Sequence, residues 1–184
     1  KLDRLADFVQ SSDEWFRPVA LRLGPDGCLY FVDWYNKIIS HNEVPRNHPE
    51  RDKKRGRIWR VKHKDAKPID VPDFMKLSGD DLVAKLGGEN TTQSHLAWQA
   101  ITDRQLISLV PELKSIVRDP AQPAARRVAS LWALDGLRQI DVALLNPLVT
   151  ETNRNLRREA VRAFGSAGVI ASAIRDGRWQ AIHD

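Results

Sequence analysis

The sequence predicts an α+β fold in which an antiparallel β-sheet comes first and helices follow. Up to about residue 64, apolar residues recur at a period of two, which is typical of strands with a buried face. From residue 78 onward the period is 3.6, which is typical of amphipathic helices. A proline-containing linker over residues 65–77 separates the two patterns. We therefore expect domains at residues 1–64 and 78–184.

Three strands are expected in the first domain. In residues 17–23 apolar side chains occupy alternate positions, so one face of this strand should be buried. The Pro-Asp-Gly run at residues 25–27 predicts a tight hairpin, because it supplies a fixed φ and a residue free to take positive φ. Residues 28–34 are almost continuously apolar, which predicts a second strand covered on both faces, and residues 57–61 predict a third. Three such strands are only marginally stable unless other sheets pack on them.

The same stretch resembles a known family. The run P-V-A-L-x-x-G-P-D-G-x-L-Y-x-x-D-W begins at Pro18, Asn36 follows it, and R-D-K-x-R-G-R-I-W-R-V runs from Arg51 to Val61. From Trp15 to Arg60 the chain resembles the last blade of a β-propeller of the quinoprotein sugar dehydrogenase-like group, with an NHL-like core pattern. More narrowly, it is similar to the "membrane-bound dehydrogenase" proteins of planctomycetes.

In that family a propeller precedes HEAT-like helical repeats and often a c-type cytochrome domain. The resemblance implies that this chain is the closing blade and the repeat scaffold of a larger sugar or alcohol dehydrogenase, inactive alone and extracytoplasmic or periplasmic. It implies pyrroloquinoline quinone and calcium as cofactors of the parent protein. It also implies the remaining blades and a cytochrome c domain as partners. Since the family's catalytic histidine belongs to other blades, no catalytic residue is assigned here.

The second domain reads as an α-solenoid of helix pairs. We expect the helix that starts near Thr92 to pair with one over residues 106–117, and the helix that starts near Pro123 to pair with one over residues 142–149. Ser78 and Asn153 are expected to cap two further helices.

Small residues indicate the repeat period of this domain. Ala100, Ala133 and Ala163 are 33 and 30 residues apart, and small side chains let neighbouring helices approach closely. This spacing suits HEAT repeats or the related short bilin-lyase-type repeat.

Composition limits the class of protein. Of the 184 residues, 42% are hydrophobic, which excludes a disordered chain. No apolar run is long enough to cross a bilayer, and no signal-peptide pattern is present. The chain begins with a lysine, so we expect the native start to lie upstream. The single cysteine, Cys28, has no partner for an internal disulfide, and without a C-x-x-C-H motif this chain attaches no haem.

The positive charge is local. The whole chain carries +5, whereas residues 46–64 hold nine basic side chains against two acidic ones, a net +7. This indicates an anion contact or a solvated loop. Because the helices have no basic stripe, a nucleic-acid partner is not expected.

Six residues are candidates for binding a ligand or cofactor. Asp33, Trp34 and Asn36 end the second strand, where a propeller would place them near substrate or a calcium ion. Alternatively, Asp33 bonds turn amides and Trp34 packs between blades. Arg51, Asp52 and Arg55 lie in the basic segment, together with Lys53, Lys54 and Arg57.

Two interpretations of the basic segment remain open. The segment suits an anion such as the quinone cofactor that the resemblance implies. Alternatively, an Arg51–Asp52 pair ties the loop to the blade. His41 and His48 do not have the spacing of metal ligands, and no metal site is expected.

Trp98, Trp132 and Trp179 suggest either a carbohydrate-stacking surface or packing between repeats. For the whole molecule, the alternative to an enzyme is a non-catalytic propeller and HEAT scaffold that binds protein or polysaccharide.

Overall fold

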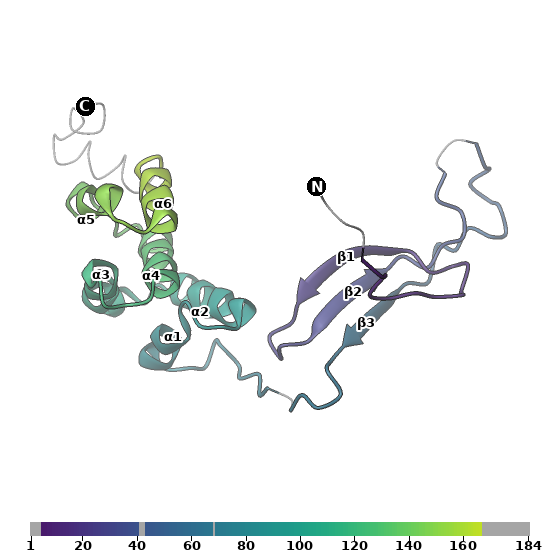
Figure 1. Ribbon diagram of the computed structural model, residues 1–184, viewed down its shortest axis with the longest axis horizontal. Helices are drawn as coiled ribbons and strands as arrows, with labels where there is room; N and C mark the ends of the chain where they lie inside the picture. The colour runs from purple at the N-terminus through teal and green to yellow at the C-terminus, as the bar shows by residue number, and fades with distance from the viewer. Residues whose placement is uncertain (1–4, 41–42, 68, 167–184) are drawn as a thin grey trace. The chain divides into compact units, whose positions relative to one another are not determined.

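The computed structural model describes residues 5–40, 43–67 and 69–166 (Figure 1). Within them the chain is α+β, with a three-stranded antiparallel sheet followed by six α-helices. The chain divides into two compact units, residues 1–69 and residues 70–184, and each is described by itself. The division falls inside the predicted linker.

All three predicted strands form. They are β1 (Pro18–Leu23), β2 (Leu29–Asp33) and β3 (Arg57–Val61), in the spatial order β1-β2-β3 with antiparallel pairing throughout (Figure 1).

The predicted hairpin joins β1 to β2. The Gly24 amide donates to the Cys28 carbonyl at 2.8 Å, and the Asp26 carboxylate accepts from the Cys28 amide at 3.1 Å. Gly27 has a φ of 79°, a conformation that favours glycine.

Both faces of the sheet carry apolar side chains, and within the described residues only one face is covered in part. The register places Leu21, Phe31 and Trp59 on one face. Phe31 is buried there, in contact with Phe16 and stacked on Trp59 at 6.2 Å between ring centroids. Leu21 nevertheless remains 59% exposed, although the strand pattern predicts a buried face.

The opposite face holds the apolar residues Ala20, Val32 and Ile58, next to a polar row of Arg22, Tyr30 and Arg60. Val32 is 42% exposed and Ile58 is 73% exposed. The described residues of this chain leave Val32 and Ile58 exposed, so cover for both faces of β2 stays a prediction about sheets outside it. An apolar run shows that both faces are suited to burial, but it does not show which polypeptide covers them.

Two helices of the second unit begin where the predicted capping residues lie. Ser78 and Asn153 cap their helices as expected. Asn90, not Thr92, caps the second helix: the Asn90 side chain accepts from the Gln93 amide at 3.0 Å, while Thr92 already lies inside the helix. The helices are α1 (Gly79–Lys85), α2 (Thr91–Asp103), α3 (Val110–Arg118), α4 (Ala124–Gly136), α5 (Val142–Leu145) and α6 (Arg154–Phe164), with the short 3₁₀ helices η1 (Ile107–Leu109) and η2 (Asn146–Thr150).

The helices pair in a different phase from the one predicted. α1 packs on α2, α3 packs on α4, and α5 and η2 pack on α6, while α2, α4 and α6 contact one another in a row. The predicted pairings of α2 with α3 and of α4 with α5 are therefore wrong. The short turn at residues 119–123 folds α4 directly back on α3, which amphipathic periodicity alone does not reveal.

The predicted 33-residue spacing recurs in the backbone. α2 and α4 both end in a Schellman cap whose reversing residue, Gln105 or Arg138, has positive φ (49° and 56°). Ala100 and Ala133 are buried one turn before these caps. The cap hydrogen bonds are Leu106 N to Ile101 O and Gln105 N to Thr102 O after α2, and Gln139 N to Leu134 O and Arg138 N to Asp135 O after α4.

A single apolar cluster fills the helical unit, from Phe74 to Ala163. One buried cation is paired inside it: Arg127 donates to the Val117 carbonyl at 2.9 Å, which satisfies the end of α3, and also bonds Glu151. Within the described residues, no helix combines the length and hydrophobicity needed to cross a bilayer.

Candidate functional site

The carboxylate of Asp33 is the centre of the polar contacts in the sheet unit. It is fully buried at the end of β2. One oxygen accepts from the amides of Arg17 at 2.7 Å and Tyr35 at 3.0 Å, and the other accepts from the Arg57 guanidinium at 2.7 Å and the Trp59 indole at 3.0 Å. Asp33 thereby joins the segment before β1 to β2 and β3, and both of its oxygens face protein donors.

These bonds determine the charge state of Asp33. Burial alone raises the pKa of this carboxyl, but the hydrogen bonds from Arg17, Trp59, Tyr35 and Arg57 outweigh burial and hold the pKa below its ordinary value. Asp33 is thus a carboxylate held within the fold, which agrees with the turn-bonding alternative and leaves no oxygen turned toward a ligand.

The other two residues at the end of β2 differ in exposure. Trp34 is half-exposed, and its amide donates to the Arg17 carbonyl at 2.9 Å. Asn36 is buried: its amide group donates to the Asp52 carbonyl at 3.0 Å, and its oxygen accepts from the Ile38 amide at 3.2 Å. Asn36 therefore ties the end of β2 to the loop that carries Asp52.

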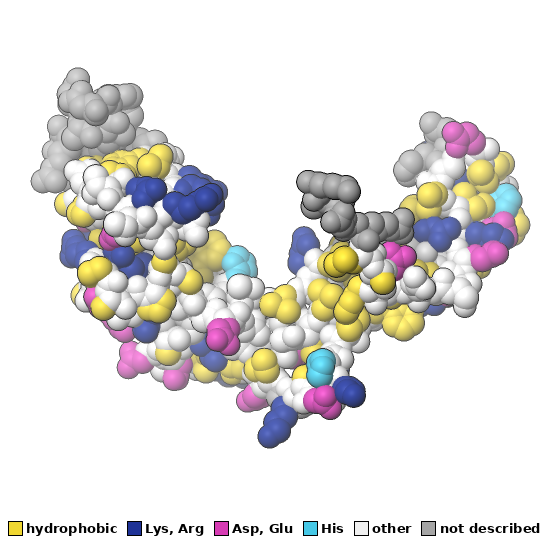
Figure 2. All heavy atoms as spheres, in the orientation of Figure 1, with side chains coloured by type: hydrophobic (Ala, Val, Ile, Leu, Met, Phe, Trp, Pro, Cys, Tyr) yellow, Lys and Arg dark blue, Asp and Glu magenta, His cyan; other side chains and the backbone are white. Residues whose placement is uncertain are grey.

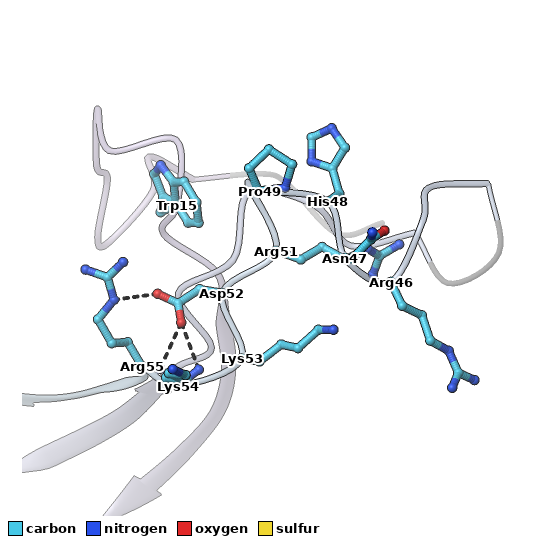
Figure 3. Close-up of a pocket in the computed structure, with 10 residues that line it drawn as sticks. All are labelled: Trp15, Arg46, Asn47, His48, Pro49, Arg51, Asp52, Lys53, Lys54 and Arg55. Atoms are coloured by element: carbon cyan, nitrogen blue, oxygen red, sulfur yellow. Dashed lines mark hydrogen bonds and ion pairs between the residues drawn. The ribbon is translucent and has the colours of Figure 1, made fainter.

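Asp52 organises the turn before β3. One carboxylate oxygen accepts from the amides of Lys54 at 2.8 Å and Arg55 at 3.0 Å, and the other pairs with the Arg55 guanidinium at 2.5 Å (Figure 3). The Lys54 amide, followed by the contacts of Arg55, lowers the pKa of Asp52 despite the opposing effect of desolvation.

The alternative in which Arg51 pairs with Asp52 is wrong. The Arg51 guanidinium donates instead to the carbonyls of Ser40 and, at 2.9 Å, Val44, and it extends away from Asp52 in Figure 3. The reason is local: the Asp52 carboxylate is turned toward the amides of its own turn, so Arg51 closes the preceding loop.

Arg51, Asp52 and Arg55 line an open hollow of about 600 Å³ together with other residues of the basic loop (Figure 3). Five of its side chains are cationic and one is acidic, and the acidic one is already paired with Arg55. Arg46, Lys53 and Lys54 are exposed and make no ion pair within the described residues. The lining residues are Trp15, Arg46, Asn47, His48, Pro49, Arg51, Asp52, Lys53, Lys54 and Arg55.

The hollow can attract an anion, but it holds no evident catalytic group. Guanidinium and ammonium groups suit carboxylate or phosphate oxygens. The nitrogen Nδ1 of His48 accepts from the Glu50 amide at 3.2 Å, so this histidine takes part in loop structure. Among the described residues there is no group of three or more His, Cys, Asp or Glu side chains that would hold a metal ion.

The sequence pattern indicates Asp52 and the cations of this hollow, but it does not indicate Trp15. Arg57 belongs to the Asp33 network and also pairs with Asp13 at 2.9 Å, so it is not part of the anion surface. Trp15 lines the hollow and stacks on Tyr35 at 5.6 Å. No local pattern indicates Trp15, because its partners lie far along the chain. His41 and Trp179 lie outside the described residues.

Comparison with known proteins bears on the sheet unit. Residues 2–65 match the family described as "Domain of unknown function (DUF7133)". The match covers well under half of the chain and ends before the helices begin. No curated protein and no solved structure matched the chain. The match thus groups the strands and the basic loop as one domain and assigns them no activity.

Proposed function

We propose that the chain is a scaffold within a larger protein. Its sheet unit is one blade of a β-propeller, the closing one, and its helical unit is a HEAT-like solenoid segment that binds a partner. In this proposal the chain contributes assembly and binding, and it is inactive by itself.

One observation carries the proposal: both faces of the three-stranded sheet expose apolar side chains. Leu21 lies on one face and Val32 and Ile58 lie on the other, and all three are at least 42% exposed. Figure 2 shows hydrophobic side chains gathered on this unit. A two-layer protein needs one apolar sheet face, whereas a propeller blade needs two, because it packs between neighbouring sheets.

The energetic argument favours covering both faces. Burying a Leu, Val or Ile side chain contributes about 1.5–3 kcal/mol each. A sheet of three short strands has little other apolar burial, since its only fully covered ring in the described residues is Phe31. Packing between neighbouring blades would supply the missing stability.

The mass of the native gene product tests the proposal first. A product several times heavier than 20.9 kDa is expected, with these residues near the end of a predominantly β protein. A native product near 20.9 kDa that runs as a monomer would contradict it.

Substitutions in that native product test the packing of the two faces. Leu21→Asp and Ile58→Asp should each sharply lower the yield of folded product. Ile39→Asp is the matched control, because Ile39 is as exposed as Leu21 but lies in a loop. Equal yields for all three variants would show that neither sheet face is covered.

A second candidate function rests on the cationic hollow. The resemblance to quinoprotein sugar or alcohol dehydrogenases implies an anionic quinone, and Arg46, Lys53 and Lys54 supply charge that suits such a group. Calcium fits less well than the quinone, because the carboxylate oxygens of Asp33 and Asp52 that could bind it already accept hydrogen bonds within the fold. We therefore derive no reaction step through these cofactors in this chain.

The native product also tests this second function. Titration with pyrroloquinoline quinone and calcium, followed by dye-linked sugar oxidation, should restore activity if the parent is such an enzyme. Lys53→Gln combined with Lys54→Gln should then weaken quinone binding, whereas Lys62→Gln, outside the hollow, should not. If the folded, quinone-treated product oxidises no sugar, the dehydrogenase function is contradicted and only the scaffold role remains.

A further inference from the structure

A groove runs across the row of helices α2, α4 and α6. It consists of two adjoining hollows of about 420 and 250 Å³, which share the residues Thr91, Ser94 and Ala129. The smaller hollow begins at the Gly87–Gly88 turn, and the larger one reaches Arg162 of α6. All of the lining residues belong to the helical unit.

The aromatic walls of the groove are fixed in place. The Trp98 indole donates to the Trp132 carbonyl at 2.9 Å, and the Trp132 indole donates to the Glu159 carboxylate at 3.1 Å. Both side chains are half-buried and line the larger hollow. Because their polar atoms are bonded within the fold, the rings present preformed apolar surface, which lowers the entropy cost of binding.

The charged side chain that lines the groove is positive. Neither hollow is lined by Asp or Glu, and Arg162 is 66% exposed at one end. Arg158 and Arg162 share the single buried carboxylate of Glu159, so this end keeps a net positive charge. Figure 2 shows Lys and Arg side chains gathered over α6.

We propose that this groove binds an extended acidic segment of a partner protein. One apolar side chain of the segment packs between Trp98 and Trp132, and a carboxylate meets Arg162. Neighbouring helix axes lie about 8–10 Å apart and an extended chain advances about 3.3 Å per residue, so crossing three helices takes roughly six residues. The inference rests on the scaffold role proposed above and specifies the chemistry of its partner.

A polysaccharide fits the groove less well. Sugar stacking needs an open ring face, whereas the Arg162 guanidinium lies 5.7 Å from the Trp132 ring centroid and the His95 ring lies 4.9 Å from that of Trp98. An acidic side chain can pair with Arg162 where it stands, without displacing it from Trp132.

The test uses the 184-residue chain and fluorescein-labelled hexapeptides. A peptide with one Phe among five Glu residues should bind, as measured by fluorescence anisotropy at low salt. A peptide with Gly in place of Phe and a peptide with Lys in place of Glu should both bind at least about tenfold more weakly. Raising the salt concentration should weaken binding of the acidic peptide.

Two variants locate the binding. Ala129→Glu places a negative charge where the two hollows meet and should weaken binding about tenfold or more, and Arg162→Gln should weaken it about fivefold. Arg154→Gln is the matched control, because Arg154 is exposed on α6 but does not line the groove. Circular dichroism melting curves check that each variant folds.

Several results would overturn the inference: no binding of the acidic peptide at millimolar concentration, equal binding of the basic peptide, or an unchanged affinity in folded Ala129→Glu. Displacement of the peptide by cellohexaose at lower concentration would assign the groove to carbohydrate instead. None of these results affects the mass of the native product or the sheet-face variants, so the blade proposal stands or fails separately.

Discussion

The two units of this chain reach their folded states by different means. Within the described residues, the buried hydrophobic side chains of the sheet unit are Cys28 and Phe31, whereas the helical unit closes one apolar cluster from Phe74 to Ala163. The sheet unit places a charged group, Asp33, at its best-buried position. The helical unit is therefore stabilised mainly by its own apolar packing, and the sheet unit by polar contacts that hold the strand ends.

Exposed apolar residues have a different meaning in the two units. Apolar residues are exposed singly on most proteins, and Val161 of α6 is an ordinary example. On the sheet they lie on both faces of the same three strands, so they form surfaces suited to contact with other sheets.

Matched leucine truncations should have very different effects in the two units. Leu131→Ala removes a fully buried side chain from α4 and should lower the free energy of unfolding of the helical unit by about 3 kcal/mol. Leu21→Ala removes an exposed side chain and should change the free energy of unfolding of the sheet unit by about 0.5 kcal/mol or less in this chain. Hydrogen exchange with mass spectrometry on the intact chain resolves the two units.

The same pair of variants sharpens the contrast in the native product. There Leu21→Ala should become costly, because a neighbouring sheet would cover it. A large cost for Leu21→Ala already in the 184-residue chain would mean that its own residues cover this face, and the contrast would be broken.

The polar network of the sheet should be the next most sensitive feature. Asp33→Asn keeps the size of the side chain but removes the charge that pairs with Arg57, and it should destabilise the sheet unit by roughly 2–3 kcal/mol. Asp13→Asn is the control: Asp13 also pairs with Arg57 but is partly exposed, so its loss should cost much less than the loss of Asp33. Exchange of the β2 and β3 amides reports both values. Equal costs would show that burial of Asp33 contributes nothing.

Acid should loosen the sheet unit through its carboxylates. The pKa of Asp33 is lowered, and that of Asp26 is lowered to about 2 by contacts with Cys28, Tyr30 and Arg60 that outweigh desolvation. A lowered pKa gives stability that is fully present above the ordinary value of 3.8 and is lost as the pH falls through the folded value. The stability of the sheet should therefore decline between about pH 4 and pH 2.

Two indole groups provide the readout of this titration. The Trp59 indole donates to the Asp33 carboxylate and the Trp98 indole donates to a backbone carbonyl, so only the Trp59 NMR resonance should move as the carboxylate gains its proton. Asp33→Asn should abolish that movement. A Trp98 resonance that titrated with the same midpoint would assign the effect to global unfolding instead.

Local sequence patterns predict where the helices and strands lie, but they do not predict which of these elements pack against each other. The alternation in residues 57–61 predicted β3, and the capping side chains of Ser78 and Asn153 located two helix starts, because these signals depend on neighbouring residues. The pairing of α3 with α4 was missed, since the side on which a helix folds back depends on turn geometry and not on periodicity.

The candidate site shows the same limit. Charge alone indicates the basic residues of the loop, but it does not indicate the partner of Asp52: of the two open interpretations, the one with an Arg51–Asp52 pair is wrong, because Asp52 pairs with Arg55. Asp33 was recognised as a conspicuous carboxylate at a strand end. Its burial depends on Arg57 and Trp59, which follow more than twenty residues later in the chain, and a local reading of the sequence could not supply those contacts.

The smallest expected effect concerns the repeated caps of the helical unit. Arg138 has a φ of 56°, a left-handed conformation that costs a residue with a Cβ atom roughly 1 kcal/mol relative to glycine. Arg138→Gly should therefore stabilise the helical unit by about 0.5–1 kcal/mol, and Arg138→Ala, which keeps the Cβ atom, should leave it nearly unchanged. Urea unfolding followed by circular dichroism measures the difference between the two variants.

Gln105 occupies the equivalent place after α2. Gln105→Gly should therefore give a gain in stability of similar size, reduced by the loss of the hydrogen bond from the Gln105 side chain to the Thr102 carbonyl. A gain at one cap only would show that the two turns, although 33 residues apart and alike in their hydrogen bonds, do not behave as equivalent parts of a repeat.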